Sequence, residues 1–200
     1  MAEDMQFLPK KDILSLEEIE DICRIFIKLG TRKIRLTGGE PLVRKGIMQV
    51  INNLGKEVGN SLDELTITTN GSQLETKAEE LFNSGVRRIN VSLDHLDPDK
   101  FKEITRWGDL EKVIRGLKKA REVGLKIKIN TVAISNFNQY HLSDILTWCG
   151  EENFDMTIIE VMPMGDIGGD KRYGQYLPIS QVRKELEKKF TLKDLPERTS

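Results

Sequence analysis

Strand–helix alternation is the feature that most constrains the fold of this 200-residue sequence. Short runs rich in β-branched residues, such as LTITTNG and RINVSLD, alternate with longer runs whose apolar residues recur at helical spacing. Strict alternation of this kind indicates a parallel sheet with right-handed crossovers. We predict strands at 33–41, 65–71, 88–94, 125–132 and 156–162. We predict helices at 15–29, 45–57, 73–84, 110–123, 140–150 and 180–189, with a further helix from 97.

Two of the predicted helices begin at recognisable capping residues. Ser15 is a good N-cap, and Glu18 stands three residues later, as in a capping box. Gly30 follows the same helix as a stop signal. Asp97 and Pro98 suit the N-cap and the first position of another helix.

Polar residues or glycines follow every predicted strand, in TGGEP, TTNG, SLD, NTV and EVMPMG. A doubly wound sheet brings together only the strand ends near its switch point. A barrel instead gathers all its carboxyl-terminal strand ends at one mouth, where the active site lies. The pattern therefore favours an α/β barrel or open half-barrel over a doubly wound sheet.

The composition excludes several classes of protein. Lys plus Arg is 31 and Asp plus Glu is 32, so the net charge of -1 argues against a nucleic-acid partner. No apolar run is long enough to cross a membrane, and the first residues lack a signal peptide's apolar core, so we expect a cytoplasmic protein. Cys23 and Cys149 lack CxxC spacing, which argues against a metal site, and we expect both to be buried on helices.

The strongest local signal is the turn TGGEP. Gly38 and Gly39 let a ligand approach the backbone, and Glu40 can accept hydrogen bonds from an ammonium group. A plain strand-to-helix turn explains the same residues. Thr68 and Asn70 can read a base, ribose or carboxylate, although Asn70 before a glycine is also an ordinary turn.

Later strand ends offer weaker candidates. Ser92 and Asp94 occupy alternate positions and so point to the same side of their strand. His95 pairs with no nucleophile, and we expect a surface or capping role for it. Met162 either packs or lines a cofactor site. No Ser-His-Asp set, carboxylate dyad or metal cluster can be assembled from the sequence.

Basic residues within the strands suggest an anion. Lys126 and Lys128 share one face of their predicted strand, and Arg35 alternates with apolar neighbours in the first. A lysine inside a parallel strand is costly unless it reaches solvent or an anion. Either these residues line a cationic cavity that suits a phosphorylated substrate, or one face of an incomplete barrel is exposed to solvent. Both interpretations are open at this point.

Five segments together resemble the GTP 3′,8-cyclase family of radical S-adenosylmethionine (SAM) enzymes (molybdenum cofactor biosynthesis protein A). They are IRLTGGEPLVR, LTITTNG, GVRRINVSLDHLDPDKF, INTV and IIEVMPMG, in this order and spacing. The resemblance implies a partial TIM-like (β/α)6 barrel over residues 1–190, with a truncated C-terminal region beginning at 191–200. It implies a lyase of molybdenum cofactor synthesis that uses SAM and [4Fe–4S] clusters to cyclise GTP. Members of the family often form homodimers.

The resemblance also assigns residues. Gly39 would lie against SAM, with Gly38 and Glu40 beside it in the motif. Further SAM contacts would come from Ser92 and Met162. The contacts to GTP would come from Arg35, Thr68 and Lys128.

The sequence departs from the family pattern in three places. The segment MAEDMQFLPKK resembles the stretch directly after the family's CxxxCxxC loop, so we expect the first strand and the cluster loop to be missing. The three cysteines of a second, C-terminal cluster are also absent, and Thr157 stands where relatives often carry an arginine. We therefore expect these residues alone to be inactive.

Two other interpretations compete with a GTP 3′,8-cyclase fragment. One is another radical SAM enzyme that acts on a peptide, which predicts no affinity for GTP. The other is a non-catalytic nucleotide-binding remnant. The missing first strand would also expose a sheet edge, so we expect marginal stability or self-association.

Overall fold

The computed structural model describes residues 9, 12–162 and 174–196. The chain divides into two compact units, Met1–Asn130 and Thr131–Ser200. All but one of the candidate site residues belong to the first unit, and the exception is Met162 in the second. Gly165, Gly168 and Gly169, which the sequence places in the loop after the last strand, lie outside the described residues.

The five predicted strands are confirmed, and their order decides between the two architectures. They are β1 (Lys33–Leu36), β2 (Glu64–Thr69), β3 (Arg88–Ser92), β4 (Lys126–Ala133) and β5 (Asp155–Glu160). Neighbouring strands from β1 to β4 pair in parallel, and the order in the sheet is the order in the chain. A doubly wound sheet would reverse its order at a switch point. The uninterrupted order is the one found in a TIM-like barrel.

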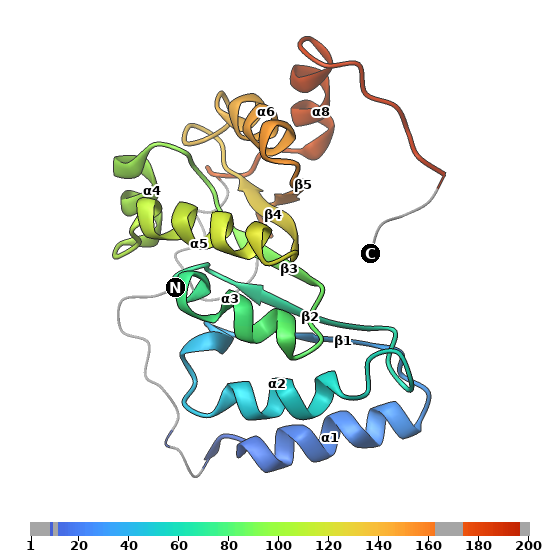
Figure 1. Ribbon diagram of the computed structural model, residues 1–200. Helices are drawn as coiled ribbons and strands as arrows, with labels where there is room; N and C mark the ends of the chain where they lie inside the picture. The colour runs from blue at the N-terminus through green and yellow to red at the C-terminus, as the bar shows by residue number, and fades with distance from the viewer. Residues whose placement is uncertain (1–8, 10–11, 163–173, 197–200) are drawn as a thin grey trace. The chain divides into compact units, whose positions relative to one another are not determined.

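The helices form where their apolar periodicity predicts them. The first unit holds α1 (Leu16–Lys28), the short 3-10 helix η2 (Pro41–Val43), α2 (Ile47–Gly55), α3 (Leu74–Asn83), α4 (Pro98–Thr105) and α5 (Leu110–Glu122). The second unit holds α6 (Leu142–Glu152) and α8 (Ile179–Glu187). In Figure 1, α2, α3 and α5 form one layer along the strands of the first unit. Sequential parallel strands with right-handed crossovers place their helices on a single face in this way.

The two expected N-caps are present. Ser15 accepts a hydrogen bond from the backbone N–H of Glu18, whose side chain accepts one from the N–H of Ser15. The Asp97 side chain accepts from the N–H of Lys100 at 2.9 Å, directly before Pro98. Each cap of this kind stabilises its helix by about 1 kcal/mol.

The helix-covered face of the sheet is apolar. Its side chains are almost fully buried and come from alternate positions of β2, β3 and β4: Leu65, Ile67, Ile89, Val91, Ile127 and Ile129. Burying each such side chain contributes about 1.5–3 kcal/mol, so this face supplies the main driving force for folding of the first unit.

Helix α1 corrects one prediction. Cys23 was expected to be buried, but it is only partly covered, and none of the residues of α1 is buried. Ile25 and Phe26 are more than half exposed, and Leu29 just beyond the helix is 77% exposed. The helical period correctly identifies the apolar stripe of α1, but it does not show how much of that stripe the rest of the chain covers.

The second unit has a small core of its own. It comprises Ala133, Leu142, Leu177, Val182 and Leu186. Cys149 is buried on α6, as predicted, and burial raises the pKa of its thiol to about 12. This thiol therefore stays protonated at neutral pH.

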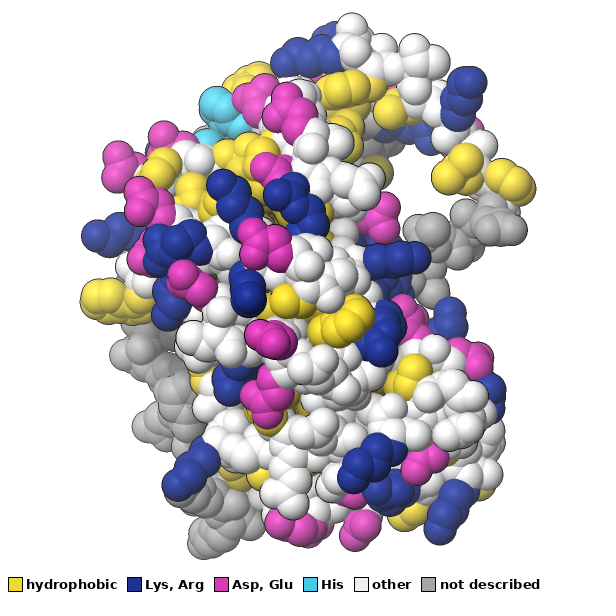
Figure 2. Space-filling view, viewed as in Figure 1, with side chains coloured by type: hydrophobic (Ala, Val, Ile, Leu, Met, Phe, Trp, Pro, Cys, Tyr) yellow, Lys and Arg dark blue, Asp and Glu magenta, His cyan; other side chains and the backbone are white. Residues whose placement is uncertain are grey.

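The charged side chains lie on a mixed surface. Figure 2 shows Lys and Arg side chains interspersed with Asp and Glu over the face in view, as the composition predicts. None of the helices that the structure describes is long and apolar enough to cross a membrane.

Candidate functional site

The sheet face opposite the helices is polar along its whole width in the first unit. Side chains alternate between the two faces of a strand, and residues paired across parallel strands share a face. The register therefore places polar side chains from all four strands on this face, which we call the polar face: Lys33, Arg35, Glu64, Thr66, Thr68, Arg88, Asn90, Ser92, Lys126, Lys128 and Asn130.

The polar face is organised in rows that run across the strands. One row joins Arg35 to Thr66, then to Arg88 and Lys126. The next row toward the carboxyl ends contains Thr68, Asn90 and Lys128.

The structure thus brings together the three residues that the resemblance assigns to GTP. Thr68 and Lys128 share a row, with one residue between them, and Arg35 lies in the preceding row. Ser92 lies one row beyond Lys128 and pairs with Asn130. The predicted shared face of Lys126 and Lys128 is confirmed.

Lys128 is the most unusual group on the polar face. Only 8% of the residue is exposed, and no hydrogen bond or ion pair joins its ammonium to any residue in the described part of the chain. The Lys128 Nζ is not fully enclosed, so the lysine covers most of its stem while its ammonium keeps some contact with solvent. Its strand neighbour Lys126 is exposed, so Lys128 differs from it in combining a covered stem with an unpartnered ammonium. An anion bound at this row would give that ammonium a partner.

Among the described residues, one fully buried polar atom of the polar face lacks a partner. Thr66 is 2% exposed, and its Oγ1 makes no hydrogen bond. Nearby, Arg88 donates to both carboxylate oxygens of Glu64 at 2.9 and 3.1 Å, which neutralises that arginine. Among the described residues, no carboxylate pairs with Lys33, Arg35, Lys126 or Lys128, so these are the positive charges of the polar face that a ligand can meet. Lys128 alone of the four is a buried residue.

Glu40 joins the end of β1 to the end of β2. Its Oε1 accepts from the backbone N–H of Leu42 at 3.0 Å and from the Thr69 hydroxyl at 2.8 Å. Its Oε2 accepts from the N–H of Asn70 at 2.6 Å and lies 3.0 Å from the same hydroxyl. Both carboxylate oxygens are therefore engaged by the protein itself, and Glu40 fixes the position of the glycine turn relative to β2.

The glycine turn leaves room for a ligand. Gly38 and Gly39 are exposed, and a Cβ built on either would meet no atom within 4 Å. Gly38 has φ of 156°, which side-chain-bearing residues rarely adopt. The turn thus presents open backbone beside the strand end, where a ligand can approach closely.

Two other candidates have mainly structural contacts. The Asn70 Oδ1 accepts from the N–H of Ser72 at 2.9 Å, and Gly71 has φ of 81°, which supports an ordinary turn here. His95 was expected at the surface or in a cap. It is buried, and its Nδ1 accepts from the N–H of Asp97 at 2.9 Å, so the capping role is the correct one.

Two candidates belong to the second unit and are described by themselves. Met162 follows β5 and is 63% exposed. Thr157 lies within β5 and is half-buried.

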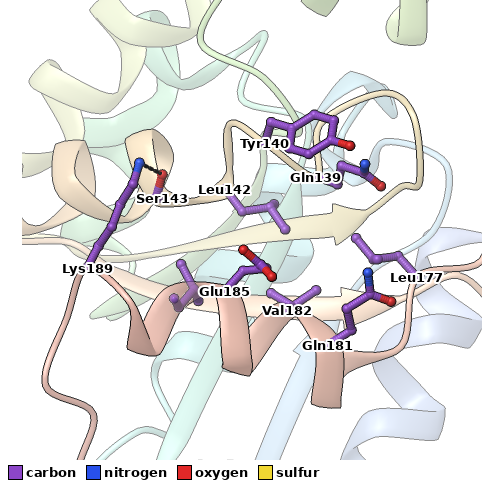
Figure 3. Close-up of a pocket in the computed structure, with 10 residues that line it drawn as sticks. Gln139, Tyr140, Leu142, Ser143, Leu177, Gln181, Val182, Glu185 and Lys189 are labelled. Atoms are coloured by element: carbon purple, nitrogen blue, oxygen red, sulfur yellow. Dashed lines mark hydrogen bonds between the residues drawn. The ribbon is translucent and has the colours of Figure 1, made fainter.

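The second unit also contains a pocket of about 380 Å³ (Figure 3). Leu142, Leu177 and Val182 provide apolar walls, and the Lys189 ammonium donates to the Ser143 hydroxyl at 2.8 Å across one end. None of the predicted site residues lines this pocket. It also lacks an unpartnered ammonium like that of Lys128, so the polar face remains the candidate site.

A model of a known protein family matches the part of the chain that contains the glycine turn and strands β1 to β4. The model described as the radical SAM superfamily matches residues 2–149, which is most of the chain. This chain belongs to the radical SAM superfamily. The match includes the polar face, so Gly38–Glu40 and the ends of β2 to β4 all lie within the radical SAM domain.

Curated relatives resemble this radical SAM chain along its whole length. A protein named GTP 3′,8-cyclase from Rhizobium etli (strain CIAT 652) is 57% identical over 199 residues, which span 100% of this chain and 57% of that protein. One of the same name from Sinorhizobium medicae (strain WSM419) is 58% identical over 200 residues, again 57% of that protein. The chain therefore spans little more than half the length of the curated relatives that it matches.

Solved radical SAM structures share the fold. The crystal structure of Streptococcus suis SuiB superimposes with a TM-score of 0.67 and 19% identity, covering 89% of this chain and 41% of that one. Native anSMEcpe with bound AdoMet gives 0.63 and 19%, covering 88% of this chain and 51% of that one. At these identities the likeness concerns the fold alone.

Six residues of the polar face were not predicted from the sequence: Lys33, Glu64, Thr66, Arg88, Asn90 and Asn130. All six lie at positions that alternate with apolar residues of their strands. The same alternation had pointed to Arg35 and Lys128. Applied to all four strands, it would have found the remaining members of the face.

Glu40→Gln tests whether this carboxylate stabilises the two strand ends. An amide puts an NH₂ group opposite a backbone N–H, so at least one of the bonds to Leu42 and Asn70 is lost. We expect a loss of about 1–3 kcal/mol in the free energy of unfolding, measured by urea denaturation. Glu79→Gln, on the exposed face of α3, is the control and should change little. Equal stability of the two variants would contradict a stabilising role of the Glu40 carboxylate at the two strand ends.

Proposed function

We propose that this chain is part of a GTP 3′,8-cyclase of molybdenum cofactor synthesis. That lyase converts GTP to (8S)-3′,8-cyclo-7,8-dihydroguanosine 5′-triphosphate. The observation that carries the proposal is Lys128, a largely covered lysine whose ammonium has no partner among the described residues, beside polar groups of β2 and β3. A nucleoside triphosphate supplies the missing negative charge and the hydroxyls and ring nitrogens that such groups bond. The identity of 57–58% to proteins of this name supports the same substrate.

In this proposal, GTP lies along the polar face. Lys128 and Arg35 bind its phosphate oxygens, and the Thr68 hydroxyl bonds the nucleoside. Thr68 and Lys128 belong to one row, about two strand spacings apart, or roughly 10 Å between their Cα atoms. That separation suits a ligand the length of a nucleotide rather than a single small anion.

The glycine turn is proposed to hold SAM. Gly38 and Gly39 provide open backbone for it, Glu40 holds that backbone in place, and Ser92 and Met162 add contacts. The open space beside both glycines fits a bound group of this kind. When bound next to a reduced iron–sulfur cluster, SAM supplies the radical with which this class of reaction begins.

The described residues do not fit an iron–sulfur cluster. No group of three His, Cys, Asp or Glu side chains lies close enough to share a metal in the part of the chain that the structure describes. Cys23 and Cys149 lie on separate helices, and burial raises the pKa of both thiols, whereas a cluster requires thiolates. We assign no cluster ligand to this chain, and we propose that these residues alone do not complete the reaction.

The remaining features of the proposal follow from the family. Residues 1–190 form part of a radical SAM core, and the protein works in the cytoplasm as a homodimer, without nucleic acid. The mixed surface charge suits this assignment. A peptide substrate is less well supported, because the polar face offers unneutralised positive charge rather than a long apolar groove.

Calorimetric titration of the chain with GTP tests the proposal. We expect GTP to bind at least about 10-fold more tightly than guanosine, because its phosphates form ionic interactions with the ammonium of Lys128. Lys128→Ala should abolish this preference. Lys118→Ala removes an exposed lysine of α5 and is the control. Absence of GTP binding by the unmodified chain would refute the nucleotide site.

A further inference from the structure

Asn90 occupies the centre of the polar face. It pairs in register with Thr68 on one side and with Lys128 on the other. The residue is 2% exposed, so its amide is buried in a row that also contains a hydroxyl and an amine. A buried amide is costly unless its donors and acceptors are used, which gives this residue type a role that packing alone would not require.

The contact with Thr68 sets the direction of a hydroxyl. Asn90 Nδ2 donates to Thr68 Oγ1 at 3.5 Å, the long end of the hydrogen-bond range. A threonine hydroxyl that accepts from one neighbour keeps its own hydrogen for another acceptor. No described residue receives that hydrogen, so it is available to a ligand on the polar face.

The position beside Lys128 matters through charge. A carboxylate at position 90 would pair with the adjacent ammonium across one strand spacing, about 4.8 Å. The ammonium would then have a permanent counter-ion and no longer need a ligand. An amide has nearly the same shape but no charge, and it leaves the positive charge of Lys128 uncompensated until an anion binds.

We propose that Asn90 is a positioning residue of the nucleotide site, which rests on the proposed function. Its amide orients the Thr68 hydroxyl as a donor toward an acceptor atom of the nucleotide, and its neutrality keeps Lys128 available for the phosphates. The residue thus acts through its two neighbours, and the choice of Asn over Asp makes this row of the sheet an anion site.

Asn90→Asp separates this role from a purely structural one. The new carboxylate pairs with Lys128, so the variant should unfold at the same or a higher urea concentration than the parent chain. Its affinity for GTP should nevertheless fall at least about 100-fold, because the anion site is neutralised. A residue needed only for packing would give the opposite pattern, with lower stability and little change in affinity for the folded fraction.

A double-mutant cycle tests the action through Thr68. Asn90→Ala and Thr68→Val are combined, and GTP affinity is measured by calorimetry for all four proteins. We expect each single change to weaken binding about 10-fold and the double change to weaken it little further, because both remove the same oriented hydroxyl. Asn83→Ala, at the exposed end of α3, is the control.

The outcomes distinguish this inference from the proposed function. If the parent chain does not bind GTP, both are overturned. If the parent binds and Lys128→Ala abolishes binding, while Asn90→Ala and Asn90→Asp stay within 2-fold of the parent, only the role of Asn90 is overturned. Additive losses in the cycle would overturn the action through Thr68, and unfolding of Asn90→Asp would overturn the proposed pairing with Lys128.

Discussion

Replacing Gly55 with alanine is expected to destabilise the first unit by about 3–5 kcal/mol, among the largest effects of any single substitution. Gly55 ends α2, where the backbone of this helix touches the residues that follow α3. A Cβ on Gly55 would lie 1.6 Å from the carbonyl oxygen of Ser84 and 2.8 Å from its carbonyl carbon. Both of these are backbone atoms, so no side-chain rotation can relieve the clash.

The surroundings of Gly55 make separation of the two helices costly. Gly85 lies against Gly55 and has a φ angle of 90°. A Cβ on Gly85 would lie 2.9 Å from the Gly55 carbonyl oxygen. The Ser84 hydroxyl also donates to Asn52 of α2 at 2.8 Å. Moving α2 away to accommodate a methyl group therefore breaks a hydrogen bond and opens the buried face between α2 and α3.

Gly150→Ala in α6 is the matched control. This residue also lies within a helix, but a Cβ on it would meet no atom within 4 Å. Alanine has the higher helix propensity, so the substitution should stabilise its unit by about 0.5–1 kcal/mol. Urea unfolding followed by circular dichroism measures both variants. A Gly55→Ala chain within about 1 kcal/mol of the parent would contradict the close backbone contact.

Local signals in the sequence predict much of the fold. Ser15 and Asp97 fix the starts of α1 and α4 because an N-cap depends on residues only three positions away. The parallel sheet follows from strict alternation, since parallel strands require long crossovers. Sequential strand order could be inferred only indirectly, from polar strand ends, because several sheet topologies satisfy the same alternation.

The features that were missed depend on residues far apart in the chain. The burial of Cys23 depends on the segments that pack against α1, which the period of the helix does not reveal. The hydrogen bonds of Glu40 come from Thr69 and Asn70, about 30 residues later. Sequence reasoning therefore identified Glu40 as part of a motif but not as the link between two strand ends.

Asn90 is a different case, because a signal for it was present. The run RINVS alternates polar and apolar residues over one short strand, as does the first part of TITT. Register is needed to place Asn90 beside Lys128, and register depends on pairing between strands that are 34 or more residues apart. The period predicts which residues share a face, whereas only the structure places them in one row.

Lys128→Met is expected to change stability and nucleotide binding in opposite directions. Methionine is unbranched and of similar length, so it can fill the same space without burying a charge. The chain without ligand should gain up to about 1 kcal/mol in its free energy of unfolding, because an apolar side chain replaces a largely covered lysine whose ammonium has no partner. Affinity for GTP should fall at least about 100-fold, because the phosphates lose a buried, charge-assisted partner.

Lys126→Met is the matched control, because Lys126 lies two positions earlier on the same face of β4 but is exposed. Its ammonium is already solvated, so we expect a stability change within about 0.5 kcal/mol and a much smaller loss of affinity. Urea unfolding and GTP calorimetry measure the stability and the GTP affinity of both variants. Higher stability together with weaker GTP binding in Lys128→Met, but not in Lys126→Met, is expected only if the ammonium of Lys128 binds the ligand. A destabilised Lys128→Met chain would mean that the ammonium has a partner in solution, and unchanged GTP affinity would place the phosphates elsewhere.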